Sequence, residues 1–67
     1  QNRKDLLHSC VARLPKEQRD VLILRYHKEM SFKEIADYTG VSINTALGRM
    51  RYALMNLRKM APRQAFD

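Results

Sequence analysis

The 67-residue sequence lacks several features that define common functional classes. No apolar run approaches the ~20 residues that a membrane-spanning helix needs, and no stretch has the pattern of a signal peptide. The one cysteine, Cys10, excludes an internal disulfide and fits a reducing compartment. Repeats, low-complexity tracts and segments with β-strand alternation are also missing. We therefore expect one small, cytoplasmic, all-α domain that does not enter a membrane.

The sequence also lacks a recognisable catalytic or metal-binding constellation. His8 and His27 have no partners at ligand spacing, and His8 and Cys10, two positions apart, point to different faces of a helix. No nucleophile–base pair, phosphate-binding loop or metal cluster is present, so we predict no catalytic residue, no metal site, no cofactor and no enzyme activity. Both histidines are interpreted as surface or helix-end residues.

Acidic residues are absent from the stretch 41–60. The chain has a formal net charge of +6, which favours a polyanionic partner. Residues 1–30 hold seven basic and four acidic side chains, a mixture typical of a solvated surface, whereas 41–60 hold only Arg49, Arg51, Arg58 and Lys59. Charges of one sign on a helix repel each other unless an anion lies beside them, so this excess is interpreted as functional. The alternative is a solvated basic face.

Two apolar segments near the start of the chain predict the first two helices. One helical face is formed by Leu6, Leu7, Cys10, Val11 and Leu14. Pro15 is expected to end this helix, because the residue before a proline is disfavoured in the helical region, and to begin the next helix. The second helix is predicted over residues 15–27, with apolar surface from Val21, Leu22, Ile23 and Leu24.

The third helix has the clearest local signals. Ser31 and Glu34 form an S-x-x-E capping box, in which the side chain of each residue can satisfy the backbone amide of the other. Met30 and Ile35 flank the box as a hydrophobic staple. The helix is predicted over residues 32–39, because Gly40 then ends it in a left-handed conformation.

A fourth helix is expected after a short turn. Ser42 is its predicted N-cap, and it continues to about Met60, before Pro62. The domain is thus expected over residues 1–60, with 61–67 as a flexible C-terminal tail. The predicted fold class is all-α: a four-helix bundle with a C-terminal helix-turn-helix, winged-helix-like in type, in which the third helix braces the fourth so that it can lie in the major groove of DNA.

The fourth helix is expected to divide into two faces. Its apolar positions recur at steps of three and four, so we expect Ala46, Met50, Ala53, Leu54 and Leu57 to face inward, together with Val41 of the turn. From the third helix, Ile35 and Ala36 should also face inward, and small Ala36 permits the two helices to approach closely.

The outward residues near the start of the fourth helix are the candidate DNA-binding site. They are Ser42, Asn44, Thr45, Leu47, Gly48, Arg49, Arg51 and Tyr52, with Ile43 beside them. Asn, Arg and hydroxyl side chains hydrogen-bond to base edges, and apolar side chains contact thymine methyl groups. Ser42, Thr45 and the helix amides could instead hold a phosphate. Gly48 costs about 1 kcal/mol relative to alanine inside a helix, so we expect a close approach there; the alternative is an incidental residue.

Several motifs resemble region 4 of bacterial sigma-70 family factors, particularly the extracytoplasmic-function group. The residues that carry the resemblance are LPKEQRDV (14–21), LRY (24–26), SFKEIA (31–36) and GVS (40–42), followed by Thr45, Arg49, Ala53, Leu57 and Arg58 in the family's order. The resemblance covers almost the whole chain. At the positions of Leu47 and Gly48 the family often has a basic and a small polar residue. We therefore expect these two differences to affect which DNA bases the chain prefers.

The resemblance implies a function and partners. It implies that the last helix binds the promoter −35 element as double-stranded DNA, with Leu47, Gly48, Arg51 and Tyr52 facing the DNA and Arg49 near its backbone. It further implies that an apolar concavity docks on the flap of the RNA polymerase β subunit, and that an anti-sigma factor is a further partner. Because a sigma factor also needs a region that melts the −10 element, we expect this chain to be an excised C-terminal domain, and a monomer.

Two other non-enzymatic classes remain as alternatives. The DNA-binding domain of a two-component or quorum-type response regulator has four helices and a similar KEIA segment, but its last helix typically carries a His where Arg49 stands here, and it tends to dimerise on paired half-sites. A protein-interaction module that has lost DNA binding is the second alternative, against which the basic fourth helix argues.

Overall fold

The computed structural model describes residues 3–60, and the side chains of residues 8–60. It contains four α-helices, α1 (Arg3–Ala12), α2 (Lys16–Leu22), α3 (Phe32–Thr39) and α4 (Ile43–Met60), and a short π-helix, η1 (Ile23–His27), which follows α2 directly. Within residues 3–60 there is no strand, so the all-α prediction is confirmed and this part of the chain has no β-wing. The predictions for the side chains of Leu6 and Leu7 and for a tail at 61–67 lie outside the described residues.

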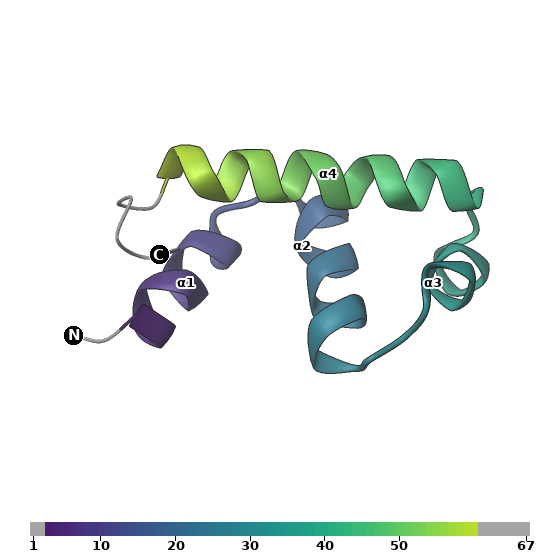
Figure 1. The fold of residues 1–67 in the computed structure, drawn as a ribbon, viewed down its shortest axis with the longest axis horizontal. Coiled ribbons are helices and arrows are strands. Elements are labelled where there is room, and N and C mark those ends of the chain that lie inside the picture. Colours follow the sequence, from purple (N-terminus) through teal and green to yellow (C-terminus); the bar gives the residue numbers. More distant parts are fainter. Residues whose placement is uncertain (1–2, 61–67) are drawn as a thin grey trace.

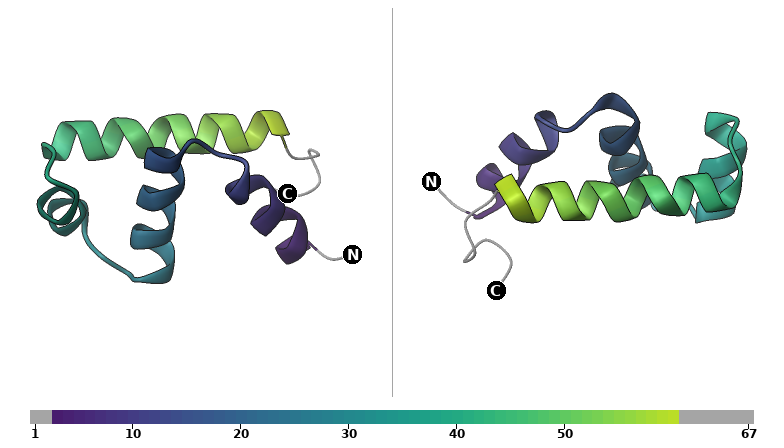
Figure 2. Two further views of the ribbon diagram at one scale, coloured as in Figure 1. Left: turned by 180° about the vertical axis from the view of Figure 1, so that it is seen from behind. Right: turned by 90° about the horizontal axis from the view of Figure 1, so that it is seen from above.

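The long helix α4 organises the fold. The other three helices all lie on one side of α4, with α3 at its N-terminal end, α2 below its middle and α1 towards its C-terminal end (Figure 1). The view from above shows α4 running past each of them in turn (Figure 2). Because α4 has 18 residues, its apolar stripe is long enough to form a common core with all the shorter helices.

The core is small and is built around one stripe of α4. Its buried members are Cys10, Leu14, Val21, Leu22, Ile35, Ala36, Ala46, Met50, Ala53 and Leu57. Ala36 on α3 and Ala46 on α4 are almost fully buried, which confirms the expected close packing of these two helices. Cys10 is buried among hydrophobic side chains, as predicted, rather than exposed as a nucleophile.

Leu54 was predicted to face inward and does not, and Ile23, which was predicted only to supply apolar surface to the second helix, is exposed as well. Ile23 and Leu54 keep 40% and 42% of their surface exposed, respectively. Both lie beside the opening between α1 and η1, where no further helix of the described chain covers them. The periodicity of α4 correctly identifies Ala46, Met50, Ala53 and Leu57 as buried, but it overestimates the width of the buried stripe at Leu54.

The second helix differs from the predicted single α-helix over residues 15–27. Pro15 is the residue before α2, with extended backbone angles and no side-chain cap, and α2 itself ends at Leu22. The next five residues form η1, whose end is closed by hydrogen bonds from the amide of Lys28 to the carbonyl of Ile23 and from the amide of Met30 to the carbonyl of Leu24. Such π-helical turns are rare and frequently occur at functional sites.

The ends of α3 follow the sequence signals closely. The Ser31 hydroxyl accepts from the Glu34 amide at 3.1 Å, and the Ser31 amide donates to the Glu34 carboxylate at 2.8 Å, so the predicted capping box is confirmed. Gly40 ends the helix with φ +73°, and its amide donates to the carbonyl of Ala36. This left-handed residue turns the chain so that α4 starts only three residues later, at Ile43.

The loop before α3 is tied back to η1 by one arginine. Arg25 donates from its guanidinium to the carbonyl of Met30 at 3.2 Å, and its guanidinium carbon lies 5.5 Å from the centre of the Phe32 ring. Stacking of this kind adds a cation–π attraction to the hydrogen bond. Arg25 therefore helps to orient α3, which in turn supports the start of α4.

Candidate nucleic-acid interface

The structure brings the predicted DNA-binding residues together on one end of α4. Six of the eight are exposed, namely Ser42, Asn44, Thr45, Leu47, Arg51 and Tyr52, while Gly48 and Arg49 are half-buried. Tyr52 has 58% of its surface exposed, and the neighbouring apolar side chains Ile43 and Leu47 have 45% and 41%. The start of α4 thus presents a continuous surface that mixes cationic, polar and apolar groups, which is the combination used to contact base edges.

The turn between α3 and α4 sets the position of this surface. Ile35 and Ala36 of α3 are buried against the core, and Val41 of the turn packs onto it. Thr39 donates from its hydroxyl to the carbonyl of Ile35 at 2.7 Å, which satisfies an acceptor in the last turn of α3. The two helices are therefore held by packing and by the left-handed Gly40, in the arrangement of a helix-turn-helix.

Hydroxyl groups fix the first turn of α4. The Ser42 hydroxyl accepts from the Thr45 amide at 3.1 Å and lies 3.0 Å from the Thr45 hydroxyl. The predicted N-cap at Ser42 is thereby confirmed. Both hydroxyls are exposed, so each can exchange this internal contact for one with an external acceptor.

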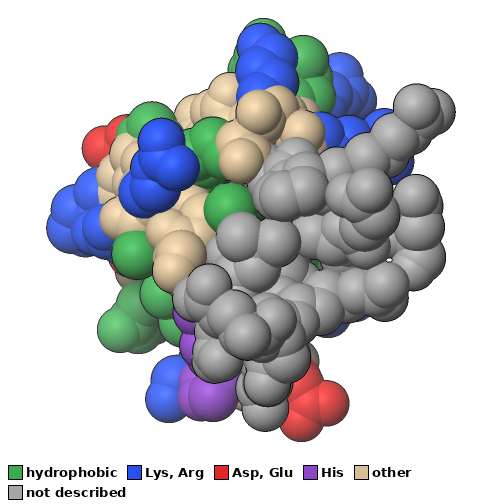
Figure 3. All heavy atoms as spheres, turned by 90° about the vertical axis from the view of Figure 1, so that its left-hand side faces the viewer, with side chains coloured by type: hydrophobic (Ala, Val, Ile, Leu, Met, Phe, Trp, Pro, Cys, Tyr) green, Lys and Arg blue, Asp and Glu red, His purple; other side chains and the backbone are tan. Residues whose placement is uncertain are grey.

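Charge on α4 is of one sign. Its 18 residues include Arg49, Arg51, Arg58 and Lys59 but no Asp or Glu. Within residues 8–60, the one ion pair joins Lys16 and Asp20 of α2, at 2.7 Å, so neither Arg49 nor Arg51 is neutralised by a described carboxylate. Figure 3 looks at the end of the molecule that carries α1 and shows more Lys and Arg than acidic side chains there as well.

Gly48 is not required by packing within the described chain. A Cβ atom built on Gly48 would meet nothing within 4 Å. Because glycine has no side chain, it allows another backbone or a ligand to come close. Because no described part of this chain does so, the space over Gly48 is open to an external partner.

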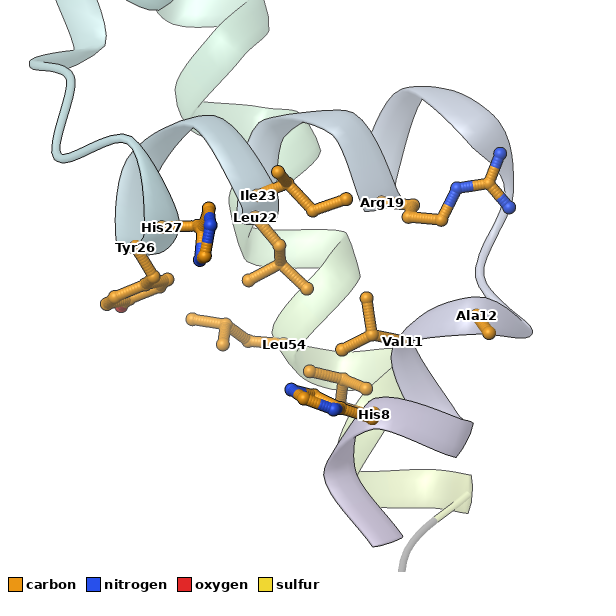
Figure 4. Close-up of a pocket in the computed structure, with 10 residues that line it drawn as sticks. His8, Val11, Ala12, Arg19, Leu22, Ile23, Tyr26, His27 and Leu54 are labelled. Atoms are coloured by element: carbon orange, nitrogen blue, oxygen red, sulfur yellow. The ribbon is translucent and has the colours of Figure 1, made fainter. Parts of the chain in front are cut away.

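A second surface feature was only partly foreseen from the sequence. An open apolar groove of about 700 Å³ lies between α1, the α2–η1 segment and α4 (Figure 4). Its apolar lining comes mainly from Val11, Leu22, Ile23, Leu54 and Leu57, and its polar edge from His8, Arg19, Tyr26 and His27. The incomplete burial of Ile23 and Leu54 is explained by this groove.

The comparisons with known proteins agree with this geometry. The family described as "Sigma-70, region 4" matches residues 4–60 of the chain. The chain belongs to this family. It is also similar to the RNA polymerase sigma factor SigV of Bacillus subtilis (strain 168), with 35% identity over 52 residues. These residues are 78% of this chain but only 31% of the relative, so the chain spans about a third of the length of that protein.

Membership defines the functional class of this sigma region 4 domain. It is a DNA-binding regulatory domain of the transcription machinery. Nothing in the comparisons favours the response-regulator alternative. No solved structure matches the chain significantly.

Two further observations concern metals and membranes. In the described part of the chain, no three or more His, Cys, Asp or Glu side chains are grouped so as to hold a metal ion. None of the helices within residues 3–60 combines the length and the hydropathy of a membrane-spanning segment.

Sequence reasoning missed the residues that line the groove. Leu54 was assigned to the core, and His8 and His27 were interpreted only as surface or helix-end residues; both histidines are indeed exposed, but they lie at the same opening. One signal could have identified this surface. Ile23, Tyr26 and Leu54 are large side chains in a domain of short helices, and all three remain exposed at the groove.

Proposed function

We propose that this domain recognises the −35 element of promoter DNA through the first three turns of α4. The observation that supports this proposal is a surface on α4 without acidic side chains. It is formed by Ser42, Asn44, Thr45, Leu47, Gly48, Arg49, Arg51 and Tyr52. A helix of this kind, braced by α3, fits the major groove, which is wide enough for an α-helix. The family to which the chain belongs supports the assignment to a sigma factor.

The proposed contacts divide by chemistry. Arg51 and Tyr52 are exposed and face base edges, with Leu47 placed to contact thymine methyl groups and Asn44 to bind adenine. Arg49 is half-buried and extends less far from the surface than the exposed Arg51, so it contacts the DNA backbone rather than a base edge. Ser42 and Thr45 bind a phosphate at the start of the helix, where the helix dipole favours an anion.

The same domain is proposed to dock on RNA polymerase core. The groove between α1, η1 and α4 is the apolar concavity for the flap of the β subunit, and it lies away from the first turns of α4. We further propose that the domain acts as a cytoplasmic monomer on a single site, and that an anti-sigma factor can cover these surfaces.

DNA recognition is tested by selecting duplexes from a randomised library with the 67-residue chain. The proposal expects one uninterrupted motif, whereas a dimeric regulator would select two half-sites. Affinity for the selected duplex should fall steeply with salt, because phosphate contacts release counterions. Arg51→Ala should cost about 1–3 kcal/mol in binding and relax the preference at one base pair.

A matched control removes charge elsewhere. Arg13→Ala deletes one cation in the exposed connection between α1 and α2, outside the proposed surface. It should change the duplex affinity much less than Arg51→Ala. Equal losses for the two variants, with unchanged circular dichroism, would show that only the total charge matters and that the assigned surface is wrong.

Docking is tested with core RNA polymerase from Bacillus subtilis, the source of the similar sigma factor. Leu54→Asp places a charge in the groove without removing a buried core side chain, because Leu54 is 42% exposed and is not one of the core residues. This variant should lose retention on the core enzyme while keeping its affinity for the selected duplex. Retention equal to that of the unchanged chain would contradict docking through the groove.

A further inference from the structure

The loop before α3 is fixed to η1 at both backbone polar groups of one residue. The amide of Met30 donates to the carbonyl of Leu24 at 3.0 Å, and the carbonyl of Met30 accepts from the guanidinium of Arg25 at 3.2 Å. The Met30 side chain packs against the hydrophobic core. Because the next residue, Ser31, is the N-cap of α3, these contacts determine where α3 begins.

Arg25 also contacts the first residue of α3. Its guanidinium carbon lies 5.5 Å from the centre of the Phe32 ring. Both side chains are half-buried, and Phe32 packs against the core. A guanidinium is planar, so it can stack on an aromatic ring and donate hydrogen bonds from its edge, whereas the ammonium of lysine has no such plane. The contacts of Arg25 with Met30 and Phe32 are called the arginine clamp below.

The arginine clamp acts on a connection that needs an anchor. Figure 1 shows the loop running from the end of η1, which is remote from α4, across to α3. In this loop Glu29 has φ +56°, a left-handed conformation that a residue with a side chain keeps only where its surroundings hold it. The turn at Glu29 brings Met30 back to η1, where Leu24 and Arg25 bind its backbone.

α3 supports the end of α4 that carries the proposed DNA-binding surface. It lies at the N-terminal end of α4, whereas α2 and α1 lie towards the middle and the C-terminal end (Figure 1). Its buried residues Ile35 and Ala36 share one core with Ala46 of α4, which has 0% of its surface exposed. Close packing transmits small displacements, so a shift of α3 also moves the first turns of α4.

We infer that Arg25 is a positioning residue for DNA recognition, because the arginine clamp holds α3 where it sets the first turns of α4 for contact with bases. This inference rests on the DNA recognition proposed above. Without the clamp, the duplex must restore the position of α3 as it binds, so the loss of affinity is limited to the stabilisation that the clamp supplies. Phosphate contacts, which carry no sequence information, tolerate a displaced helix better than base contacts do.

The test compares Arg25→Lys with the unchanged 67-residue chain on two duplexes of equal length, the selected duplex and one with the same bases in scrambled order. Arg25→Lys keeps the charge but loses the plane that the clamp needs. It should bind the selected duplex about 3- to 10-fold more weakly, the size expected for one hydrogen bond and one stacking contact. Its affinity for the scrambled duplex, which depends on phosphate contacts, should change less than about twofold.

A second variant distinguishes the clamp from a direct phosphate contact. Arg25→Met removes the charge and keeps an unbranched apolar stem. The clamp predicts losses of similar size for Arg25→Lys and Arg25→Met on the selected duplex, with an unchanged salt dependence. A phosphate contact would instead leave Arg25→Lys with full affinity, and Arg25→Met would reduce the salt slope by about one on both duplexes. That result would overturn the inference.

A matched control excludes a general loss of stability as the cause. Gln18→Ala removes the hydrogen bond from Asn56 and leaves the arginine clamp intact. Below its melting temperature it should keep the ratio of the affinities for the selected and the scrambled duplex, whereas Arg25→Lys should lower this ratio. An equal fall of the ratio in both variants would overturn the inference.

Hydrogen exchange tests the clamp without DNA. In Arg25→Lys, the amides of α3 should exchange about 3- to 10-fold faster relative to those of α2, because α3 loses a local restraint. Unchanged protection of α3 would overturn the inference and leave the DNA recognition proposal intact. Failure of the unchanged chain to select any duplex motif would instead contradict the proposed function, and with it the role of the clamp in DNA recognition.

Discussion

Asn56 on α4 donates a hydrogen bond from Nδ2 to Oε1 of Gln18 on α2, with 2.7 Å between the two atoms. The two residues are 38 positions apart in the sequence, and both are half-buried. The hydrogen bond joins α2, which lines the groove, to α4, which carries the proposed DNA-binding surface. These two helices pack against each other in the middle of the fold. This pair is therefore a polar complement to the hydrophobic core.

Asn56→Ala should lower the free energy of unfolding by about 1 kcal/mol, because the amide of Gln18 then loses its partner while half-buried. For a domain of this size, the loss corresponds to a fall of roughly 4–8 °C in the melting temperature. Thermal unfolding followed by circular dichroism measures it. A double-mutant cycle with Gln18→Ala should give a coupling energy of at least about 0.5 kcal/mol; strictly additive losses would show that the two side chains do not interact in solution.

The capping box of α3 predicts a pH dependence of stability. The hydrogen bond from the Ser31 amide, supported by the Ser31 side chain, lowers the pKa of the Glu34 carboxyl below its ordinary value of 4.5. A lowered pKa in the folded state means that the stabilisation is fully present above pH 4.5 and is lost as the pH falls through the folded-state pKa. The stability advantage of the unchanged chain over Glu34→Gln should therefore shrink as the pH falls from 6 to 3.

The measurement compares melting temperatures of the two chains at several pH values in that range. Asp37→Asn is the matched control, because Asp37 is an exposed carboxylate on the same helix that takes no part in the cap. A difference between the unchanged chain and Glu34→Gln that stays constant down to pH 3 would contradict the role assigned to the carboxylate.

Two left-handed residues should respond to substitution in opposite directions. Glu29 has φ +56° and Gly40 has φ +73°. A side chain is strained in this region, so Glu29→Gly should stabilise the fold by about 0.5–1 kcal/mol. Gly40→Ala should destabilise it by about 1–2 kcal/mol, and through the backbone alone, since a Cβ at Gly40 meets nothing within 4 Å.

Urea unfolding of both variants provides the measurement, with the midpoint expected to rise for Glu29→Gly and to fall for Gly40→Ala. Gly40→Val should be at least as damaging as the alanine variant, because a β-branched residue rarely holds a positive φ. A stabilising Gly40→Ala substitution would show that the turn between α3 and α4 does not need a left-handed residue.

Local signals explain how much of this fold is predictable. The capping box at Ser31, the left-handed Gly40 and the N-cap at Ser42 act within one turn of each other, and the predicted bounds of α3 and the start of α4 agree with the structure. The π-helix η1 was not predicted, because apolar periodicity over five residues does not distinguish it from an α-helix. Glu29 gave no signal for its left-handed conformation, since glutamate rarely adopts one.

The candidate site was predictable to a similar degree. The pattern of α4 identified the outward residues, because polar and basic side chains remain where no helix packs. It could not identify the groove, since the exposure of Leu54 depends on how far α1 lies from η1, and that spacing is set by tertiary packing. The Asn56–Gln18 pair was missed for the same reason. The DNA contacts themselves remain a prediction.

Gly48 separates the requirements of folding from those of the proposed function. Gly48→Ala adds a methyl group that meets nothing within 4 Å in the described chain, so it should raise the stability of α4 by about 1 kcal/mol. If the wall of the major groove approaches α4 at this point, the same methyl group should weaken binding to the selected duplex by about 1 kcal/mol, roughly fivefold.

Met55→Ala is the control, because Met55 is an exposed side chain of α4 outside the proposed surface and should leave the duplex affinity unchanged. A more stable Gly48→Ala variant with undiminished affinity would show that the DNA does not approach this position, and the orientation proposed for α4 would then have to be rotated away from Gly48.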